Sequence, residues 1–555
     1  MNVEVVQRRL WEQSKQHREH RESDSPLFPA NRYEKRVRNL MDLMHQPQWI
    51  AAACDRVLKR SRGKAAGVDR VTARHFEVRK RTELEKLRQE LKSGTYQPQP
   101  LRRVMIPKAN GKQRPLGIPC LRDKIVQEAI RMALEPIFEA EFHDSSYGFR
   151  PNRSTHHAAF RCLQLMASDY TWVIEGDVKA CFDEISHSAI LSCLREKVMD
   201  RKFLDLIRRL LKAGVNVDGV VHPTEKGVPQ GGVVSPLLSN VVLNKLDWFL
   251  HDRGKHGRAR NQASAKGIPN VKFTRYADDW CVFLTRTSKR HAEKLRDQIQ
   301  SFLRQECGVE LSLEKTHITH VRDGFDYLGF HLQVGCGRHG RYVPKIKVPR
   351  RAVTNAVQRL NEAMRHRPLQ ESSMCRIVRG SAVVRGWSNY YKIAHNFSKA
   401  ASLLDHHAFW IATKALCRKL DLTTAQCLAK YRTGNYISMG EGCMLRKAQD
   451  TKMSLNYRKP DAYDPGTGSY LDDLDWEADF QIYEWRRSGS MDLKVLALHR
   501  DGFRCRKCGT TVTWETSEAD HIQPVSQFAS FAESHSLNNV QILCDTCHEE
   551  KTYAK

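Results

Sequence analysis

The sequence has no long apolar run. No stretch of its 555 residues approaches the roughly 20 apolar residues of a membrane-spanning helix, and its opening residues hold no apolar signal core. We therefore expect a cytoplasmic protein with no membrane partner. The chain is also too long for a single hydrophobic core, since domains average about 150 residues, so several domains are expected.

Acidic residues are scarce relative to basic ones. The chain has 63 Asp and Glu residues against 91 Lys and Arg residues, which gives a formal net charge of +28. Such an excess neutralises phosphate groups, so it indicates a nucleic-acid partner and an affinity that falls steeply with salt. The 16 cysteines are spread through a chain expected to be intracellular, where a disulfide framework is not expected.

The segment Phe273 to Leu284, FTRYADDWCVFL, predicts a β-hairpin with two carboxylates at its tip. Two runs rich in β-branched and aromatic residues flank Asp278 and Asp279. Like charges side by side repel, so one of them takes up a proton unless a strong cation balances both. Magnesium suits oxygen ligands, and two such ions about 4 Å apart stabilise a phosphoryl displacement. A solvated acidic turn is the alternative interpretation.

A third carboxylate lies upstream, in TWVIEGDVKACFDEISH. The apolar run Trp172 to Ile174 is typical of a short buried strand, and Asp177 stands where that strand would end. A third carboxylate is what a site for two metal ions needs. At this point the chain resembles the reverse transcriptases, and among them the proteins encoded by bacterial group II introns. The resemblance implies that Asp177, Asp278 and Asp279 bind the metal ions of a polymerase palm.

The resemblance extends to motifs that bind nucleotides and nucleic acid. IPKANGKQRPLGIP is similar to the fingers hairpin of the family, which implies that Lys108 and Arg114 bind the incoming triphosphate. The chemistry agrees, because arginine binds phosphate oxygens in a bidentate fork and lysine acts as a mobile point charge. SYGFRPNRSTHHA is a further signature, which implies that Arg150 and Arg153 contact template or primer.

Three more residues are implied at the nucleotide site. GVPQGGVVSPLLSN resembles the segment that supports the templating base pair, so Gln230 is the implied nucleotide contact. Phe182 stands where the family has an aromatic gate, which would clash with a ribose 2′-hydroxyl and favour deoxynucleotides; a core phenylalanine is the other interpretation. LSLEKTHITH matches the far edge of the palm and makes Lys315 a phosphate contact or a general acid.

The C-terminal part of the chain holds a separate metal motif. Cys505 and Cys508 form one C-x-x-C pair, and Cys544 and Cys547 form another. Four thiolates in two such pairs are the ligand set of a tetrahedral structural zinc ion. The long gap between the pairs contains EADHIQPVS, and LNNVQILCDTCHEEKT contains the second pair. Together these two stretches resemble the HNH nucleases.

This second resemblance implies a nuclease site. Asp520 and His548 would bind one catalytic magnesium ion, and His521 would be the general base that activates water. A neutral imidazole with a pKa of about 6.5 can accept a proton at physiological pH. Asn539 is expected to orient the loop of His521. The alternative, in which the two histidines bind zinc, is disfavoured because four cysteines already saturate a tetrahedral site.

Two basic segments carry weaker signals. Residues 1–100 have apolar residues at helical spacing and match the N-terminal extension of the family, which either grips template RNA or packs as ordinary helices. Residues 251–270, HDRGKHGRARNQASAKGIPN, predict a basic, glycine-containing loop. This loop either contacts RNA or is a disordered insertion.

Helices rich in arginine are expected over residues 346–450. Here Trp387, Tyr390 and Tyr391 are interleaved with cations, so they either stack on bases or pack helix on helix. In the family this region is the thumb, called domain X, which binds intron RNA and assists splicing. Residues 451–490 are rich in Pro, Gly and Asp and predict a linker, where some relatives place a DNA-contacting region.

The sequence therefore predicts a multidomain α+β protein. It combines a right-hand polymerase, whose fingers and palm pair an antiparallel sheet with helices, an α-helical thumb, and a small zinc-stabilised ββα-metal HNH domain. The predicted ranges are 1–100 for the N-terminal extension and start of the fingers, 101–345 for fingers and palm, 346–450 for the thumb, 451–490 for the linker and 491–555 for the HNH domain.

The function implied is that of a group II intron-encoded protein. It would be an RNA-directed DNA polymerase, a maturase for intron splicing and an HNH endonuclease whose nick primes DNA synthesis during retrohoming of a mobile genetic element. Implied partners are intron RNA in a lariat ribonucleoprotein, a double-stranded DNA target and dNTPs, with Mg²⁺ and Zn²⁺ as cofactors, in the bacterial cytoplasm and on the nucleoid. A splicing cofactor with a vestigial polymerase and a reverse transcriptase adopted for host defence are the alternatives.

Overall fold

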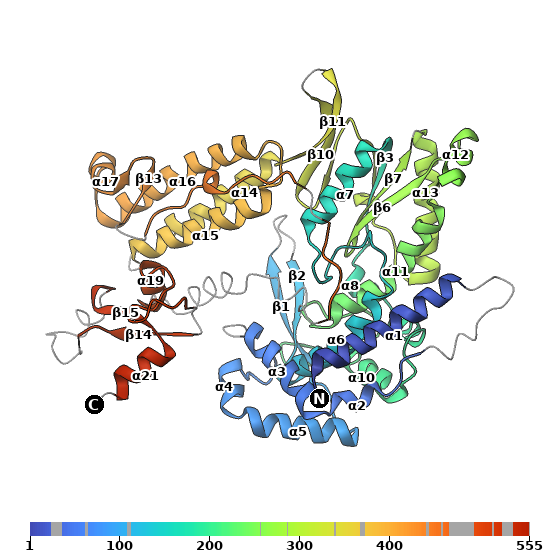
Figure 1. The fold of residues 1–555 in the computed structure, drawn as a ribbon, viewed down its shortest axis with the longest axis horizontal. Coiled ribbons are helices and arrows are strands. Elements are labelled where there is room, and N and C mark those ends of the chain that lie inside the picture. Colours follow the sequence, from blue (N-terminus) through green and yellow to red (C-terminus); the bar gives the residue numbers. More distant parts are fainter. Residues whose placement is uncertain are drawn as a thin grey trace. The chain divides into compact units, whose positions relative to one another are not determined.

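The chain forms two compact units in the computed structural model (Figure 1). The structure describes residues 1–23, 36–61, 65–107, 113–255, 257–285, 287–337, 340–366, 372–439, 443–456, 459–465, 493–512, 516–523 and 537–553. The first unit holds the described residues of 1–328, 332–345 and 457–474, and the second holds those of 329–331, 346–456 and 475–555. Within the described stretches, no helix combines the length and apolar character needed to cross a membrane.

The N-terminal part of the first unit is helical, as its spacing predicts. Its helices are α1 (Val3–Ser23), α2 (Leu40–Met44), α3 (Pro47–Ser61), α4 (Ala73–Val78) and α5 (Lys80–Ser93). Helices α1 and α3 pack against α6 (Leu121–Glu139), a helix buried along almost its whole length. The indole Nε1 of Trp49 donates to the carbonyl of Ala129 at 3.1 Å, which fixes α3 on α6.

A first sheet contains the predicted fingers hairpin. Its strands are β1 (Leu101–Pro107), β2 (Gln113–Ile118), β4 (Val215–Val217) and β5 (Val220–His222), in the order β2-β1-β4-β5. Strand β1 runs antiparallel to β2 and parallel to β4. Both strands of the hairpin are therefore present. Its tip, which includes Lys108, lies outside the described residues.

A second sheet carries the predicted metal-binding hairpin. Its strands are β3 (Tyr170–Asp177), β6 (Val271–Tyr276), β7 (Asp279–Thr285) and β8 (His317–His320), all antiparallel, in the order β6-β7-β3-β8. The central strand β7 is an almost continuous apolar run, because both of its faces are covered. Helices α7 (Thr155–Ala167), α11 (Ser235–Arg253) and α13 (Lys289–Phe302) pack against this sheet (Figure 1).

One segment of the first unit differs from its prediction. Residues 251–270 were expected to form a loop, but the end of α11 and a further helix, α12 (Gly257–Ala265), occupy much of this range. The reason is local, since Arg, Ala and Gln in this segment are strong helix formers. The other elements of this unit are α8 (Cys181–Glu184), α9 (His187–Arg195), α10 (Arg201–Leu211), η1 (Leu303–Cys307), η2 (Leu313–Lys315) and β9 (Phe325–Tyr327). Strands β10 (Phe330–Cys336) and β11 (Tyr342–Lys347) belong mostly to this unit, whereas residues 330–331 and 346–347 belong to the second.

The second unit contains the predicted arginine-rich helices. They are α14 (Arg350–Leu360), η4 (Asn361–Arg365), α15 (Ser373–Tyr391), α16 (Phe397–Leu420) and α17 (Thr424–Tyr431), followed by β12 (Arg432–Thr433), β13 (Tyr436–Ile437) and η5 (Ala448–Asp450). Trp387 is buried and donates its Nε1 hydrogen to the carbonyl of Ala352 at 3.2 Å. The ring of Tyr390 stacks on Phe330, with centroids 5.1 Å apart. These aromatic residues therefore pack helices and strands together.

The C-terminal residues form a small fold of their own. Its elements are α19 (Leu493–Arg500), β14 (Ser517–His521), η7 (Leu537–Asn539), β15 (Val540–Cys544) and α21 (Asp545–Tyr553). Strands β14 and β15 are antiparallel, and α21 follows directly, which gives the ββα order predicted for an HNH domain. A small core that includes Leu498, Val512 and Ile542 holds these elements together.

A short described part of the predicted linker belongs to the first unit and packs on α1. The ring of Tyr463 meets that of Trp11 on α1 edge-on, with centroids 6.1 Å apart. Arg8 forms an ion pair with Asp464 at 3.0 Å. We call these contacts between α1 and residues 459–465 the α1 seam. Most of the remaining predicted linker lies outside the described residues.

Candidate active sites

A two-residue turn joins β6 to β7 and carries one of the adjacent carboxylates. Tyr276 pairs with Asp279 across the ladder, so Ala277 and Asp278 form the turn itself. Ala277 has the left-handed backbone conformation (φ 57°) that tight hairpin turns use. The predicted hairpin with Asp278 and Asp279 at its tip is therefore confirmed.

The predicted third carboxylate lies beside this turn. Asp177 ends β3 and is the direct register partner of Asp279 on β7. Burial and the nearby Asp177 carboxylate raise the pKa of Asp278. Although the Asp279 residue is exposed, partial burial of its carboxyl and then repulsion from Asp278 and Asp177 raise its pKa to about 7. The three groups thus form one acidic site that a cation would stabilise.

A lysine supplies positive charge at this site. The ammonium of Lys315 donates to Oδ2 of Asp177 at 2.5 Å, and this hydrogen bond raises the pKa of Lys315. Three carboxylates are the hard oxygen ligands that magnesium prefers. Among the described residues, however, only the four C-terminal cysteines place three or more potential ligand atoms within 4.8 Å of one another. The three carboxylates are therefore neighbours, but their oxygen atoms do not all lie within 4.8 Å of one another.

Arg275, which sequence reasoning did not select, is fully buried beneath the turn (0% exposed). Its guanidinium donates to both carboxylate oxygens of Asp247, at 2.7 and 2.6 Å. It also donates to the carbonyl of Ala277 at 2.8 Å, to Oδ1 of Asn240 at 2.9 Å and to Oγ of Ser146 at 2.9 Å. We call this set of five residues the Arg275 network. No local sequence signal marks Arg275, because β6 also carries the charged Lys272 and the polar Thr274.

Two glycines allow close approach to the same turn. A Cβ atom on Gly148 would lie 2.3 Å from the backbone nitrogen of Ala277. A Cβ atom on Gly176 would lie 2.1 Å from the ring of Trp280. Real atoms do not pack at these distances, so any larger residue at either position would shift the turn or strand β3. The glycines of SYGFR and VIEGD therefore have a packing role that the sequence analysis missed.

Two of the predicted nucleotide-binding residues, Arg114 and Gln230, are joined by a hydrogen bond. Nε of Arg114 donates to Oε1 of Gln230 at 2.7 Å. Nε2 of Gln230 in turn donates to both oxygens of Asp183, at 2.9 and 2.8 Å. Asp183 follows Phe182 on α8, and the ring of Phe182 meets that of Phe149 edge-on, with centroids 6.4 Å apart. The structure therefore brings Arg114, Gln230 and the helix of Phe182 together.

The two predicted template-contacting arginines hold the segment between α6 and α7. Arg150 is buried (2% exposed) and donates to the Glu139 carboxylate at 2.9 to 3.1 Å and to the carbonyl of Ser146 at 2.8 Å. Arg153 is mostly buried and pairs with Oδ1 of Asp144 at 3.1 Å. Both guanidinium groups are thus used within the protein, and a contact with template or primer stays a prediction.

The four predicted zinc ligands meet in the C-terminal fold. All four Sγ atoms lie within 4.8 Å of one another, and those of Cys508 and Cys544 are 3.7 Å apart. A tetrahedral zinc ion with Zn–S bonds of about 2.3 Å needs sulfur atoms about 3.8 Å apart, so the cluster fits this ion. Hydrogen bonding with Thr510 lowers the pKa of Cys508 to about 6, whereas the hydrogen bond with the Cys544 side chain raises the pKa of Cys547 to about 12.

The predicted nuclease residues lie on the strand and helix that follow. Asp520 and His521 end β14, and His548 lies on α21. Lys551 of α21 donates to Oδ2 of Asp520 at 2.5 Å and to the backbone oxygen of His521 at 2.6 Å. Gln541 donates to the same Asp520 oxygen at 3.0 Å. These bonds tie α21 to the end of β14, where two of the predicted residues stand.

Asn539 forms hydrogen bonds with the backbone of the two residues that follow His521. Its backbone oxygen accepts from the N–H of Ile522 at 2.7 Å. Its side-chain amide accepts from the N–H of Gln523 at 2.9 Å and donates to the carbonyl of Gln523 at 3.1 Å. This placement is what the predicted orienting role requires.

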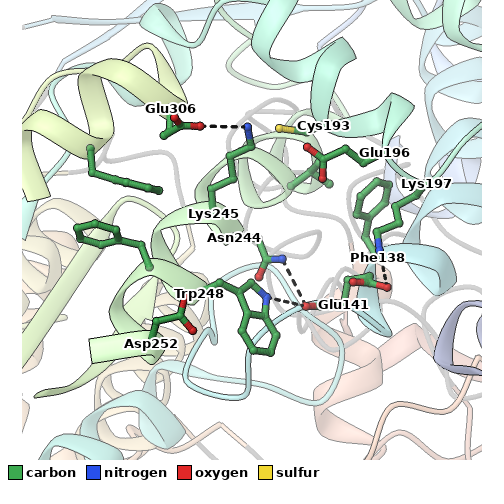
Figure 2. Close-up of a pocket in the computed structure, with 13 residues that line it drawn as sticks. Phe138, Glu141, Cys193, Glu196, Lys197, Asn244, Lys245, Trp248, Asp252 and Glu306 are labelled. Atoms are coloured by element: carbon green, nitrogen blue, oxygen red, sulfur yellow. Dashed lines mark hydrogen bonds and ion pairs between the residues drawn. The ribbon is translucent and has the colours of Figure 1, made fainter. Parts of the chain in front are cut away.

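A cavity of about 530 Å³ in the first unit is separate from these sites. It is lined by residues of α9, α11 and η1, among others. Two ion pairs join residues of this lining (Figure 2). They join Lys197 to Glu141 at 2.7 Å and Lys245 to Glu306 at 3.8 Å. None of the predicted site residues lines this cavity, so it is not part of the candidate active sites.

Three family models match successive parts of the chain. The reverse transcriptase (RNA-dependent DNA polymerase) model matches residues 106–332, and the type II intron maturase model matches residues 358–463. The HNH endonuclease model matches residues 505–554. The gathered carboxylates lie in the first match, and the cysteine cluster and His521 lie in the third.

Curated relatives match the chain over more than half of its length. The chain is 41% identical to protein YkfC of Escherichia coli (strain K12) over 342 residues, which cover 58% of this chain and 89% of that protein. It is 28% identical to the putative COX1/OXI3 intron 2 protein of Saccharomyces cerevisiae over 71% of this chain and 54% of that protein. It is 31% identical to the group II intron-encoded protein LtrA of Lactococcus lactis subsp. cremoris over 63% of this chain and 70% of that protein. The chain belongs to the group II intron-encoded proteins, as a multifunctional RNA-directed DNA polymerase with a maturase region and an HNH DNA endonuclease domain.

Proposed function

We propose that the chain helps a group II intron RNA to splice and then copies that RNA into DNA at a target that it has itself nicked. Residues 101–345 would form fingers and palm, 346–450 the α-helical thumb or domain X, and 491–555 the zinc-stabilised nuclease. The intron RNA would be held in a lariat ribonucleoprotein. The observation that carries the proposal is the gathering of three palm carboxylates on a chain that also has the residues of a nuclease.

In the palm, Asp177, Asp278 and Asp279 would hold two magnesium ions. Magnesium supplies positive charge that stabilises the attacking and leaving oxygens of the phosphoryl transfer. Burial and repulsion from Asp177 raise the pKa of both Asp278 and Asp279, and Asp278 adds to the repulsion at Asp279, which supports a site built to be completed by a cation. With a cation bound, Lys315 would release Asp177 and either contact a phosphate or donate a proton to the leaving group.

Nucleotide selection would use residues on both sides of this site. Arg114, together with Lys108, would bind the triphosphate of an incoming dNTP. Gln230 would support the base pair, because its hydrogen bonds to Arg114 and Asp183 fix its amide. Phe182 would exclude a ribose 2′-hydroxyl by contact with its ring.

In the C-terminal domain, His521 would take a proton from the attacking water. Asp520 and His548 would bind one magnesium ion, and the four cysteines would bind a structural zinc ion. The nick would free a 3′-hydroxyl in double-stranded DNA, and a nuclease on the same chain raises the concentration of this primer near the palm. Because its substrates are RNA and chromosomal DNA, we propose that the protein acts in the bacterial cytoplasm and at the nucleoid.

The test separates the three activities in the full chain bound to its intron RNA. The variant Asp278→Asn should lose primer extension by roughly 10³-fold, because metal-ion charge stabilisation is worth several kcal/mol, and should keep splicing assistance and nicking. The variant His521→Ala should lose nicking alone. Asp218→Asn, in an exposed turn, is the matched control and should keep all three activities.

The competing function, a splicing cofactor with a vestigial polymerase, gives a different result. In that case the unchanged protein would assist splicing but would not extend a primer under any magnesium concentration. Full primer extension by Asp278→Asn would refute the assignment of the palm carboxylates. Loss of splicing in His521→Ala would show that the nuclease and maturase activities are not separable.

A further inference from the structure

One exposed face of α16 has no role in the sites described above. Leu403, His406, His407, Trp410 and Lys414 follow one another at intervals of three, one, three and four residues, so they share one side of the helix. All five are exposed, and Leu403 and Trp410 are exposed to 50% and 38% despite their apolar side chains. We call these five residues, with Lys399 and Arg418 at the two ends, the α16 stripe.

The helix that carries this stripe is packed against other elements through its opposite face. Its opposite face is buried, and α16 packs against α14 and α15. Asp405 on that face is buried and accepts the backbone N–H groups of Ala448 at 2.6 Å and Gln449 at 3.1 Å. The ring of Phe409 meets that of Trp410 edge-on, with centroids 5.4 Å apart. Trp410 is therefore an exposed ring on a rigid support.

The charge of the stripe has one sign. Asp405 is the only acidic residue of α16, and it is used inside the fold. The stripe itself contains Lys399, Lys414 and Arg418 and no carboxylate. An exposed indole beside imidazoles and cations suits nucleic acid, since bases stack on the rings while the cations hold phosphates.

We propose that the α16 stripe binds a single-stranded segment of RNA, with an unpaired base stacked on Trp410 and the backbone held by Lys414 and Arg418. The strand is single because bases in a duplex are already stacked on one another and present no free face. The stripe from Leu403 to Lys414 is about 16 Å long, which is room for about five stacked nucleotides. The proposal rests on the proposed maturase function, because the RNA that this region serves would be the intron.

The test measures binding of the full chain to oligouridine, an RNA without secondary structure, over a range of salt concentrations. Trp410→Ala should weaken binding by about 5- to 100-fold, as expected for loss of one base–ring stack, without changing the salt dependence. Trp410→Phe should restore most of the affinity. Lys414→Gln should instead reduce the slope of log affinity against log salt by about 0.7. Tyr342→Ala, which removes another exposed aromatic ring, is the matched control and should bind as the unchanged protein does.

A second measurement locates the RNA directly. Oligouridine containing 4-thiouridine should crosslink to the peptide that holds Trp410, and the crosslink should disappear in Trp410→Ala. Unchanged affinity in a Trp410→Ala protein with unchanged circular dichroism would overturn the proposal. So would a loss confined to self-association measured by sedimentation, which would assign the stripe to a second copy of the chain.

The splicing assay separates this proposal from the maturase proposal. If the unchanged protein binds oligouridine through Trp410 but does not assist splicing, the proposed maturase function is refuted. The proposed RNA-binding role of the α16 stripe is then retained. If the unchanged protein assists splicing and Trp410→Ala matches it in both assays, the α16 stripe alone is refuted.

Discussion

Asp123 shows how burial sets the charge of a carboxyl far from the candidate sites. It is buried and accepts hydrogen bonds from the hydroxyl of Tyr96 at 2.5 Å and from the backbone N–H of Gln99 at 3.0 Å. Burial raises the pKa of Asp123 to about 6, and the hydrogen bonds offset this effect only in part. Because the pKa of an unfolded Asp is about 3.9, the folded state binds an extra proton between these two values.

The contribution of the Asp123 carboxyl to the free energy of unfolding should therefore be fully present below about pH 4. It should be lost as the pH rises through about 6. Asp123→Asn has no charge and keeps an acceptor for Gln99. Relative to the unchanged protein, it should gain roughly 2–3 kcal/mol between about pH 4 and pH 7. Hydrogen exchange of α6 peptides, followed by mass spectrometry, measures this change.

The control is Asp205→Asn, which removes an exposed carboxyl that pairs with Arg208. Its effect on hydrogen exchange should vary little with pH. If the difference between Asp123→Asn and the unchanged protein were the same at both ends of the pH range, Asp123 would have an ordinary pKa in the folded chain.

Residues in short motifs could be predicted from the sequence, and the residues that support them could not. Asp278 and Asp279 are adjacent, and Asp177 ends a recognisable apolar run, so their grouping needed only local patterns and a family resemblance. The partners of Arg275 are different. Asp247 and Asn240 lie 28 and 35 residues upstream, and no local pattern joins them to the turn.

At the scale of elements, the Arg275 network joins β6, α11 and the segment before α7. Two backbone hydrogen bonds reinforce it, from the N–H of Tyr147 to the carbonyl of Arg275 at 2.8 Å and from the N–H of Arg275 to the carbonyl of Ser145 at 2.9 Å. The turn that carries Asp278 is therefore held in place by the buried side chains of the Arg275 network, which have no predicted contact with the substrate. Its geometry depends on an ion pair in the core.

Removing one partner of this buried pair should be more harmful than removing both. Arg275→Met and Asp247→Leu should each reduce the free energy of unfolding of the first unit by about 3–5 kcal/mol, because each leaves an uncompensated buried charge. The double variant should lose much less than the sum. Hydrogen exchange of β6 and α11 peptides gives these values, and primer extension should fall in both single variants.

An exposed ion pair provides the comparison. Arg304 and Glu310 are 2.8 Å apart and both are largely exposed, so Arg304→Met should change stability by less than about 1 kcal/mol. Strictly additive losses in the Arg275 and Asp247 variants would mean that the two side chains act independently, and the role given to the Arg275 network would then be wrong.

Periodicity predicted elements well but not what each face contacts. The apolar spacing indicated helices after residue 346, yet it could not separate a buried aromatic residue from an exposed one. Trp387 lies in the core, whereas Trp410, which the sequence analysis did not select, is exposed. The loop predicted over residues 251–270 failed for another reason, since glycine and charge suggested a loop while the residues between them favour a helix.

At the scale of the whole molecule, the C-terminal fold combines a four-cysteine cluster with a small core, whereas the first unit has a large apolar core. The C-terminal core is small, and two of its buried members, Cys505 and Cys547, belong to the cysteine cluster. The core of the first unit extends from α1 to beyond η1. The two parts should therefore differ in their response to loss of zinc.

Replacement of one ligand tests this difference. Cys544→Ser should remove zinc from the purified protein, unfold the C-terminal domain and abolish nicking, while primer extension stays within about twofold of the unchanged protein. Zinc content, limited proteolysis and the two activity assays measure the outcome. Cys336→Ser, at an exposed cysteine outside the cluster, should have no effect. Retained zinc with normal nicking would refute the four-cysteine site.

The α1 seam has a consequence for how a gene of this kind can be shortened. A deletion that removes α1 uncovers the ring of Tyr463, and a stop codon placed before Tyr463 uncovers Trp11 and leaves Arg8 without Asp464. A descendant that discards its nuclease but keeps its polymerase would therefore do best with a breakpoint after Pro465. We expect truncated copies that remain active to end beyond this position more often than at the last helix of the maturase region.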